Sequence, residues 1–281
     1  LHSQARRRIC CTIRRYAART SAKRPDAASF DSSQAARIPT DDPRPSPAPI
    51  PSPTDRRPIR SVSAQRAFTW YADAMRLWKR GPFTFCAMAL AILVGNVGLP
   101  LVPLVGVAIA QLLLPLVECG LLYASLAADR GDRPRFRQLF AFIGAPARAQ
   151  AAVVVAALAV FAAEAFIAQM AGGYNMLMPE QNADSITGFT LVSAYAMGIL
   201  VSLPVTFVPF AALFDGEGFR DAFALSAAAF ARNVTPLVLY GALSFGLVMI
   251  GLATNGIGLL LALPWSAAAS YAAWKDIFGV A

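Results

Sequence analysis

The chain has 281 residues, of which 57% are hydrophobic and only 15% are charged, and its mean hydropathy is +0.51. Soluble domains are about 45–50% apolar and about 25% charged, so this balance is typical of a membrane protein. The only histidine is His2, which excludes most metal sites and acid–base sites built on histidine. The sequence also contains no phosphate loop, dinucleotide fingerprint or nucleophile-elbow motif, and so indicates no enzyme class.

Most of the net charge of +9 lies at the N-terminus, because residues 1–60 contain 13 basic and 5 acidic residues. This segment also has nine prolines and no glycine. We expect residues 1–65 to be a disordered basic tail, because such a composition cannot bury enough apolar surface to fold. Two alternatives are a start site placed too early and a tail that touches anionic lipid or nucleic acid. Only five residues separate Arg8 from Arg14, too few for the apolar region of a secretory signal.

Residues 66–281 contain six stretches that are long and apolar enough to cross a membrane, which takes about 20 residues. The only charged residues inside these stretches are Glu118 and Glu164. The sequence therefore predicts an all-α, polytopic transmembrane helix bundle. Its six expected spans are residues 82–99, 103–127, 149–170, 187–213, 235–254 and 257–274.

The basic residues predict the orientation of these spans. All 12 Lys and Arg from position 61 onward fall before the first span, between the second and third, between the fourth and fifth, or after the sixth. Connections rich in Lys and Arg stay on the cytoplasmic side. Both termini are therefore expected to be cytoplasmic.

The spans repeat as three helical hairpins, each preceded by a short amphipathic segment, near 68–78, 136–143 and 219–230. Aromatic residues on one face and basic residues on the other suit a helix lying in the membrane interface. Aromatic belts and edge charges are also common to all membrane hairpins, which is the alternative explanation of the repeat.

An aspartate lies at the cytoplasmic end of each hairpin: Asp129, Asp215 and Asp276. The helix dipole disfavours an anion at a helix C-terminus. We therefore expect each aspartate to pair with an arginine of an amphipathic segment. Examples of such arginines are Arg76, Arg133, Arg220 and Arg232.

Glu118 and Glu164 are the intramembrane polar candidates. Glu118 lies about 14 Å into a core of about 30 Å, where an unpaired carboxylate costs at least 2.5–3.5 kcal/mol or so. It is either a functional group or a protonated acid bonded to the backbone or to Gln111. Glu164 is expected nearer the outer edge, where water can solvate it. Four prolines interrupt the second and fourth spans, either as simple kinks or as broken helices around a transport site: Pro103, Pro115, Pro204 and Pro209.

Four short runs, residues 68–82, 127–131, 232–237 and 274–278, resemble a family of uncharacterised proteobacterial multi-pass membrane proteins. The resemblance covers residues 66–281 and implies a bacterial inner (plasma) membrane. It implies no catalytic residue.

The sequence therefore favours a non-enzymatic inner-membrane protein with a structural or interaction role. The alternative is a small-solute or ion transporter that uses the kinked spans and Glu118. The lipid bilayer is the expected partner, and small-residue seams would allow a homo-oligomer. No cofactor, metal or nucleic acid is expected.

Overall fold

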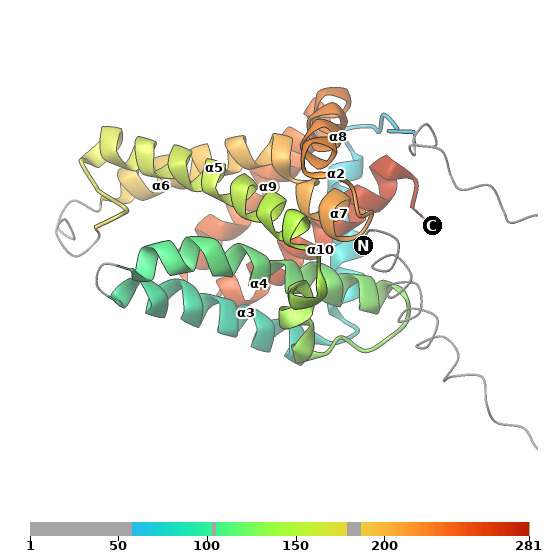
Figure 1. Ribbon diagram of the computed structural model, residues 1–281, viewed down its shortest axis with the longest axis horizontal. Coiled ribbons are helices and arrows are strands. Elements are labelled where there is room, and N and C mark those ends of the chain that lie inside the picture. Colours follow the sequence, from blue (N-terminus) through green and yellow to red (C-terminus); the bar gives the residue numbers. More distant parts are fainter. Residues whose placement is uncertain (1–57, 103–104, 179–186, 281) are drawn as a thin grey trace, which may run out of the picture. The chain divides into compact units, whose positions relative to one another are not determined.

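The computed structural model describes residues 58–102, 105–178 and 187–280 (Figure 1). The chain divides into two units, Leu1–Ser52 and Pro53–Ala281, and all described residues belong to the second. Most of the expected tail, residues 1–57, therefore lies outside the described residues.

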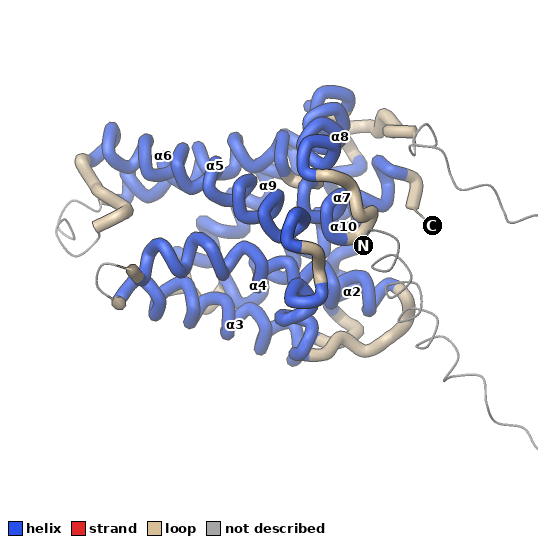
Figure 2. Tube along the Cα trace, in the orientation of Figure 1, coloured by secondary structure: helices blue, strands red, loops and turns tan. Residues whose placement is uncertain are grey.

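Every regular element in the described residues is a helix (Figure 2). Five stretches are long and apolar enough to cross a membrane, namely Pro82–Leu101, Gly106–Asp129, Ala147–Gly172, Gly188–Val205 and Val234–Ala253. In chain order the helices are α2 (Arg66–Trp78), α3 (Pro82–Gly98), η1 (Leu99–Leu101), α4 (Gly106–Asp129), η2 (Phe136–Gly144), α5 (Ala147–Gly172), α6 (Gly188–Ser202), η5 (Leu203–Val205), α7 (Val208–Leu213), α8 (Phe219–Arg232), α9 (Val234–Ala253) and α10 (Leu259–Phe278).

The long helices alternate in direction, so the two kinds of connection lie at opposite ends. In Figure 1, α2, α8 and the end of α10 lie on the right, while η1 and the residues after α5 lie on the left. The right-hand end holds all 12 Lys and Arg residues from position 61 onward. We call it the charged end.

The outer faces of the candidate spans are apolar. Only 22–44% of the most apolar stretch of each span is buried inside the protein. Phe83 is 90% exposed, and Met170 and Phe189 are each 70% exposed. Large apolar side chains that face outward on long helices are typical of a chain surrounded by lipid. The fold is thus that of a helical, multi-pass membrane protein.

Helix α10 has the opposite character, because most of its C-terminal half is buried. It packs against α2, α3, α4 and α9. Ala268, Ala269 and Ala273 are fully buried, and these small side chains let neighbouring helices approach closely. Because it faces protein rather than lipid, α10 does not need the hydropathy of the other long helices.

The expected fourth span, residues 187–213, is not one continuous helix. Helix α6 ends at Ser202, η5 follows, and α7 begins at Val208. The break falls at Pro204, which lacks the N–H group that would continue the helix. In contrast, Pro115 and Pro264 lie inside unbroken helices, α4 and α10.

The buried hydroxyl of Ser226, on α8, bonds to the backbone at this break. It donates to the carbonyl of Pro204 at 2.7 Å and accepts from the N–H of Phe207 at 3.1 Å. A break in a membrane helix is tolerated when a neighbouring side chain satisfies the freed backbone groups. Helix α8 supplies that side chain.

The structure corrects the expectation for the first amphipathic segment. Trp70 and Tyr71, on the aromatic face of α2, are buried in the protein core rather than presented to a membrane interface. The most extensive contact of α2 is the one with α10. The rings of Trp70 and Tyr71 lie against Tyr240 of α9, and Tyr71 also lies against Trp265 of α10.

The expected boundary of the tail at residue 65 is too late. Residues 58–63, which we call the strap, bond to α10 and to Asn233, between α8 and α9, and Ile59 and Val62 pack against the main core. The folded part therefore includes residues that the composition assigned to the tail.

Candidate functional site

Glu118 lies on α4 with its side chain exposed on the helix surface. Its carboxylate oxygen Oε1 accepts a long hydrogen bond of 3.5 Å from Asn96 Nδ2, on α3. The amide of Asn96 also donates to the carbonyl of Ile92 at 3.1 Å. The partner of Glu118 is therefore Asn96 rather than Gln111, one of the partners that the sequence suggested.

Glu164 lies on α5 beside Gly198, on α6. A side chain at position 198 would overlap the carboxylate of Glu164, so this glycine makes room for the acid. Helices α4 and α5, which carry Glu118 and Glu164, pack against one another. Intramembrane carboxyl groups can take up a proton or bind a cation. In the described residues, no group of three metal-ligating side chains accompanies them.

At the charged end, Asp129 and Asp276 have the same kind of environment. Each receives hydrogen bonds from one cation and one aromatic side chain on its Oδ2 atom. Lys275 Nζ and Tyr271 OH lie 2.6 and 3.0 Å from Asp129. Arg66 Nε and Trp70 Nε1 lie 2.7 and 3.0 Å from Asp276. Each of these two carboxylates is thus paired with a cation of the same chain.

The expected pairing with an arginine of an amphipathic segment holds for Asp276, whose partner is Arg66, but not for Asp129, whose partner is a lysine. Asp276 pairs with Arg66, and Asp129 pairs with Lys275 of α10 itself. Asp215 also interacts with a neighbouring group. Arg66 reaches Asp276 because α2 docks on α10, which brings residues 210 positions apart in sequence into contact.

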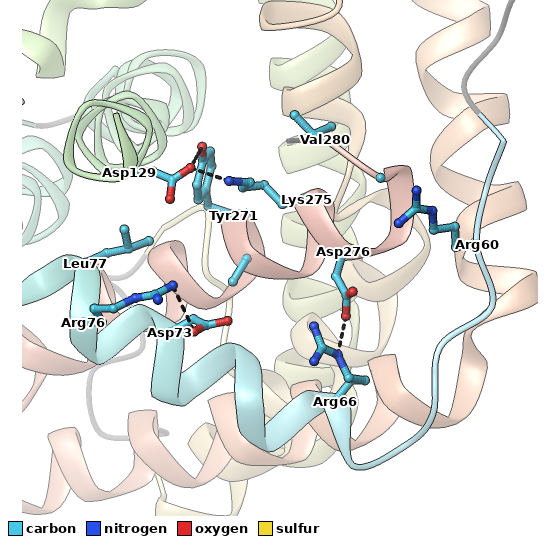
Figure 3. Close-up of a pocket in the computed structure, with 12 residues that line it drawn as sticks. Arg60, Arg66, Asp73, Arg76, Leu77, Asp129, Tyr271, Lys275, Asp276 and Val280 are labelled. Atoms are coloured by element: carbon cyan, nitrogen blue, oxygen red, sulfur yellow. Dashed lines mark hydrogen bonds and ion pairs between the residues drawn. The ribbon is translucent and has the colours of Figure 1, made fainter. Parts of the chain in front are cut away.

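A charged cavity of about 410 Å³ lies between α2, α10, the end of α4 and the strap (Figure 3). Four cationic and three acidic side chains line it: Arg60, Arg66, Arg76 and Lys275, with Asp73, Asp129 and Asp276. This site could not be predicted from the sequence, because its walls come from segments far apart in the chain. The available signal was the abundance of charges in α2 and in the last turn of α10.

The strap places Arg60 at this cavity. The Arg60 N–H donates to the carbonyl of Ile277 at 2.8 Å. The buried side chain of Asn233 bonds both to the Arg60 carbonyl, at 3.0 Å, and to the Val62 N–H, at 2.9 Å. The guanidinium of Arg60 lies where a side chain at Gly279 would be, and Gly279 has a left-handed φ of 61°. Glycine is thus favoured there twice, by conformation and by space.

The buried face of α2 is held by polar bonds as well as by packing. The Tyr71 hydroxyl lies 2.6 Å from Ser244 Oγ, and the ring of Tyr71 stacks on Tyr240. Burial raises the pKa of Tyr71 well above its usual value. The hydrogen bond to Asp276 raises the pKa of Arg66. Both groups therefore keep one protonation state at physiological pH, which is typical of structural contacts.

No family model, curated protein or solved structure matches this chain.

Proposed function

We propose that this chain is an integral protein of a bacterial inner membrane, with six spans, cytoplasmic termini and a non-enzymatic role in structure or interaction. The observation that carries the proposal is the division of the surface. Apolar side chains face outward along the long helices, while the basic residues from position 60 onward in the described part lie at the charged end. This division matches a lipid-facing belt and a cytoplasmic face.

Helix α10 is the proposed sixth span. It has 20 residues, which corresponds to about 30 Å of helix and the thickness of a bilayer core. It packs against α9, which precedes it in the chain. Its charged residues, Lys275 and Asp276, come at its last turn, level with the charged end.

A structural or interaction role is supported by the way the ionisable groups are used. Asp129 and Asp276 are bonded to cations of the same chain, which stabilises the fold. The residues that line the charged cavity do not include Glu118 or Glu164. The intramembrane acids and the cavity are thus separate features.

The proposal is tested by labelling single cysteines from outside the cell. In a variant in which the four native cysteines are replaced, Met178→Cys and Arg133→Cys are each treated with a membrane-impermeant maleimide. Both positions are exposed. We expect Met178→Cys to react in intact spheroplasts and Arg133→Cys to react only after permeabilisation. Labelling of Arg133→Cys in intact spheroplasts would refute the topology.

Transport of a cation or proton is the second candidate function. The observation that favours it is that α4 and α5, which pack against one another, each carry an intramembrane acid, Glu118 and Glu164, because such acids often mark ion pathways. Its test is cation or proton flux in proteoliposomes. Transport requires flux above that of empty liposomes, its loss in Glu118→Gln, and its retention in the control Asp132→Asn. Flux no greater than that of empty liposomes would exclude transport of the ions tested.

A further inference from the structure

We propose that the charged cavity binds a phosphate group, and that the group is supplied by the headgroup of an anionic phospholipid. The cavity lies at the charged end, where the described residues include 13 basic and 7 acidic side chains. That leaves a surplus of six positive charges. Basic pockets on the cytoplasmic side of membrane helices are suited to anionic headgroups.

The walls of the cavity are largely neutralised by their own contacts. Arg66 and Lys275 pair with Asp276 and Asp129 at 2.7 and 2.6 Å. In both pairs the side chains are partly shielded, with exposed fractions of 21–43%. These pairs hold α2, α4 and α10 together and leave little net charge on this side of the cavity.

The lining has one positive charge in excess, which belongs to Arg60. Among the described residues, Arg76 forms an ion pair with Asp73, one helical turn before it, and the Arg76 side chain is 67% exposed. The Arg60 guanidinium has no carboxylate partner in the described part of the chain, although backbone bonds of the strap hold the residue in place. Figure 3 shows Arg60 and Arg76 on opposite sides of the cavity.

Arginine suits this role because its planar guanidinium can bind two phosphate oxygens at once. Arg66 uses Nε for Asp276, so the two terminal nitrogens of its fork remain for a further acceptor. The cavity lining thus offers a phosphate group the guanidinium of Arg60, the terminal nitrogens of Arg66 and the exposed guanidinium of Arg76, from different sides of the cavity. A cavity of about 410 Å³ has room for a headgroup of this size.

The experiment measures the thermal unfolding midpoint of the full chain in neutral detergent. The probes are dihexanoyl-phosphatidylglycerol, dihexanoyl-phosphatidylcholine and inorganic phosphate. Phosphatidylglycerol should raise the midpoint in a saturable way, and phosphatidylcholine, which has no net charge, should raise it less. Inorganic phosphate reports the site without any membrane contact, so this arm does not depend on the proposed membrane location.

Arg60→Gln and Arg76→Gln are each expected to weaken phosphatidylglycerol binding about fivefold, the effect of one basic residue near an anionic headgroup. The control is Arg148→Gln, which removes an exposed charge at the same end that does not line the cavity. Because the control keeps the basic tail, non-specific attraction to the tail is the same in all variants.

Three outcomes decide the proposal. Saturable binding by phosphatidylglycerol that is weakened in Arg60→Gln and Arg76→Gln but not in Arg148→Gln supports it. Binding of inorganic phosphate alone, with no response to phosphatidylglycerol, overturns the lipid source. An equal response in all three variants, or no saturable response to either anion, overturns the site itself.

Discussion

At the scale of single residues, close contacts decide where the helices meet. Gly120, on α4, faces the backbone of η2, and a side chain at this position would overlap Leu139. The backbone of η2 cannot move as easily as the end of a long side chain. Gly120 is therefore the residue that lets η2 lie against α4.

We predict that Gly120→Ala destabilises the protein by about 1–3 kcal/mol, the usual cost of forcing extra volume into a packed site. The measurement is unfolding in mixed micelles with increasing denaturing detergent. Gly144→Ala is the control, because nothing lies within 4 Å of the methyl group that it adds. Equal stability of the two variants would show that η2 does not pack here.

Ser226 is the second decisive residue, because its hydroxyl satisfies two backbone groups at the break after α6. Ser226→Ala leaves a buried carbonyl and a buried N–H without this partner, which costs about 1–3 kcal/mol per group. We expect a lower unfolding midpoint than for Ser125→Ala. The hydroxyl of Ser125 is equally buried but donates only to Leu121, within its own helix. Similar midpoints for both variants would contradict the bridging role.

At the scale of helices, the docking of α2 on α10 determines which side chains are paired at the charged end. Two residues of α2, Arg66 and Trp70, bond to one oxygen of Asp276. Helix α2 is thus attached by charge and hydrogen bonding at one end and by buried rings along its length.

Replacing Asp276 tests this attachment. Asp276→Asn keeps an acceptor but loses the charge, so we expect part of the stability to be lost, by about 1 kcal/mol. Asp276→Ala removes the acceptor as well and leaves Trp70 Nε1 without its partner, so its loss should be larger. Protease cleavage between α2 and α3 measures the release of α2. Cleavage rates equal to that of the unmodified chain would show that Asp276 does not hold α2.

Hydropathy predicted α3, α4, α5 and α9 to within a few residues, because lipid-facing helices must be long and apolar. It did not predict the break at Pro204, since Pro115 and Pro264 occur in equally apolar sequence and leave their helices whole. Whether a proline breaks a helix depends on a partner such as Ser226, which lies on a different helix. The charged cavity escaped prediction for the same reason, because α2 had to be docked before Arg60 and Asp276 could be brought together.

At the scale of the whole molecule, α10 packs against helices from both early and late parts of the chain, namely α2, α3, α4 and α9. It is the long helix with the most polar sequence, and most of its C-terminal half is buried by its neighbours. The position of α10 therefore depends on its contacts with the other helices, whereas the other long helices are apolar enough to cross a membrane by themselves.

This difference predicts unequal insertion of isolated helices. Fused singly to a membrane-insertion reporter, α9 should insert efficiently and α10 poorly, because Lys275, Asp276 and several hydroxyl and indole groups raise its transfer free energy. In the full chain, a reporter after position 281 should lie on the same side as one placed before position 58. Efficient insertion of α10 alone would contradict its dependence on the bundle.

The docking of α2 on α10 also has a consequence for biosynthesis. Arg66 emerges from the ribosome 210 residues before Asp276, its partner in the finished protein. At a synthesis rate of about 5–20 residues per second, roughly 10–40 s pass between the synthesis of α2 and that of α10. During that interval its aromatic face lacks the surface that will bury it, so α2 can reach its final packing only after α10 has been synthesised.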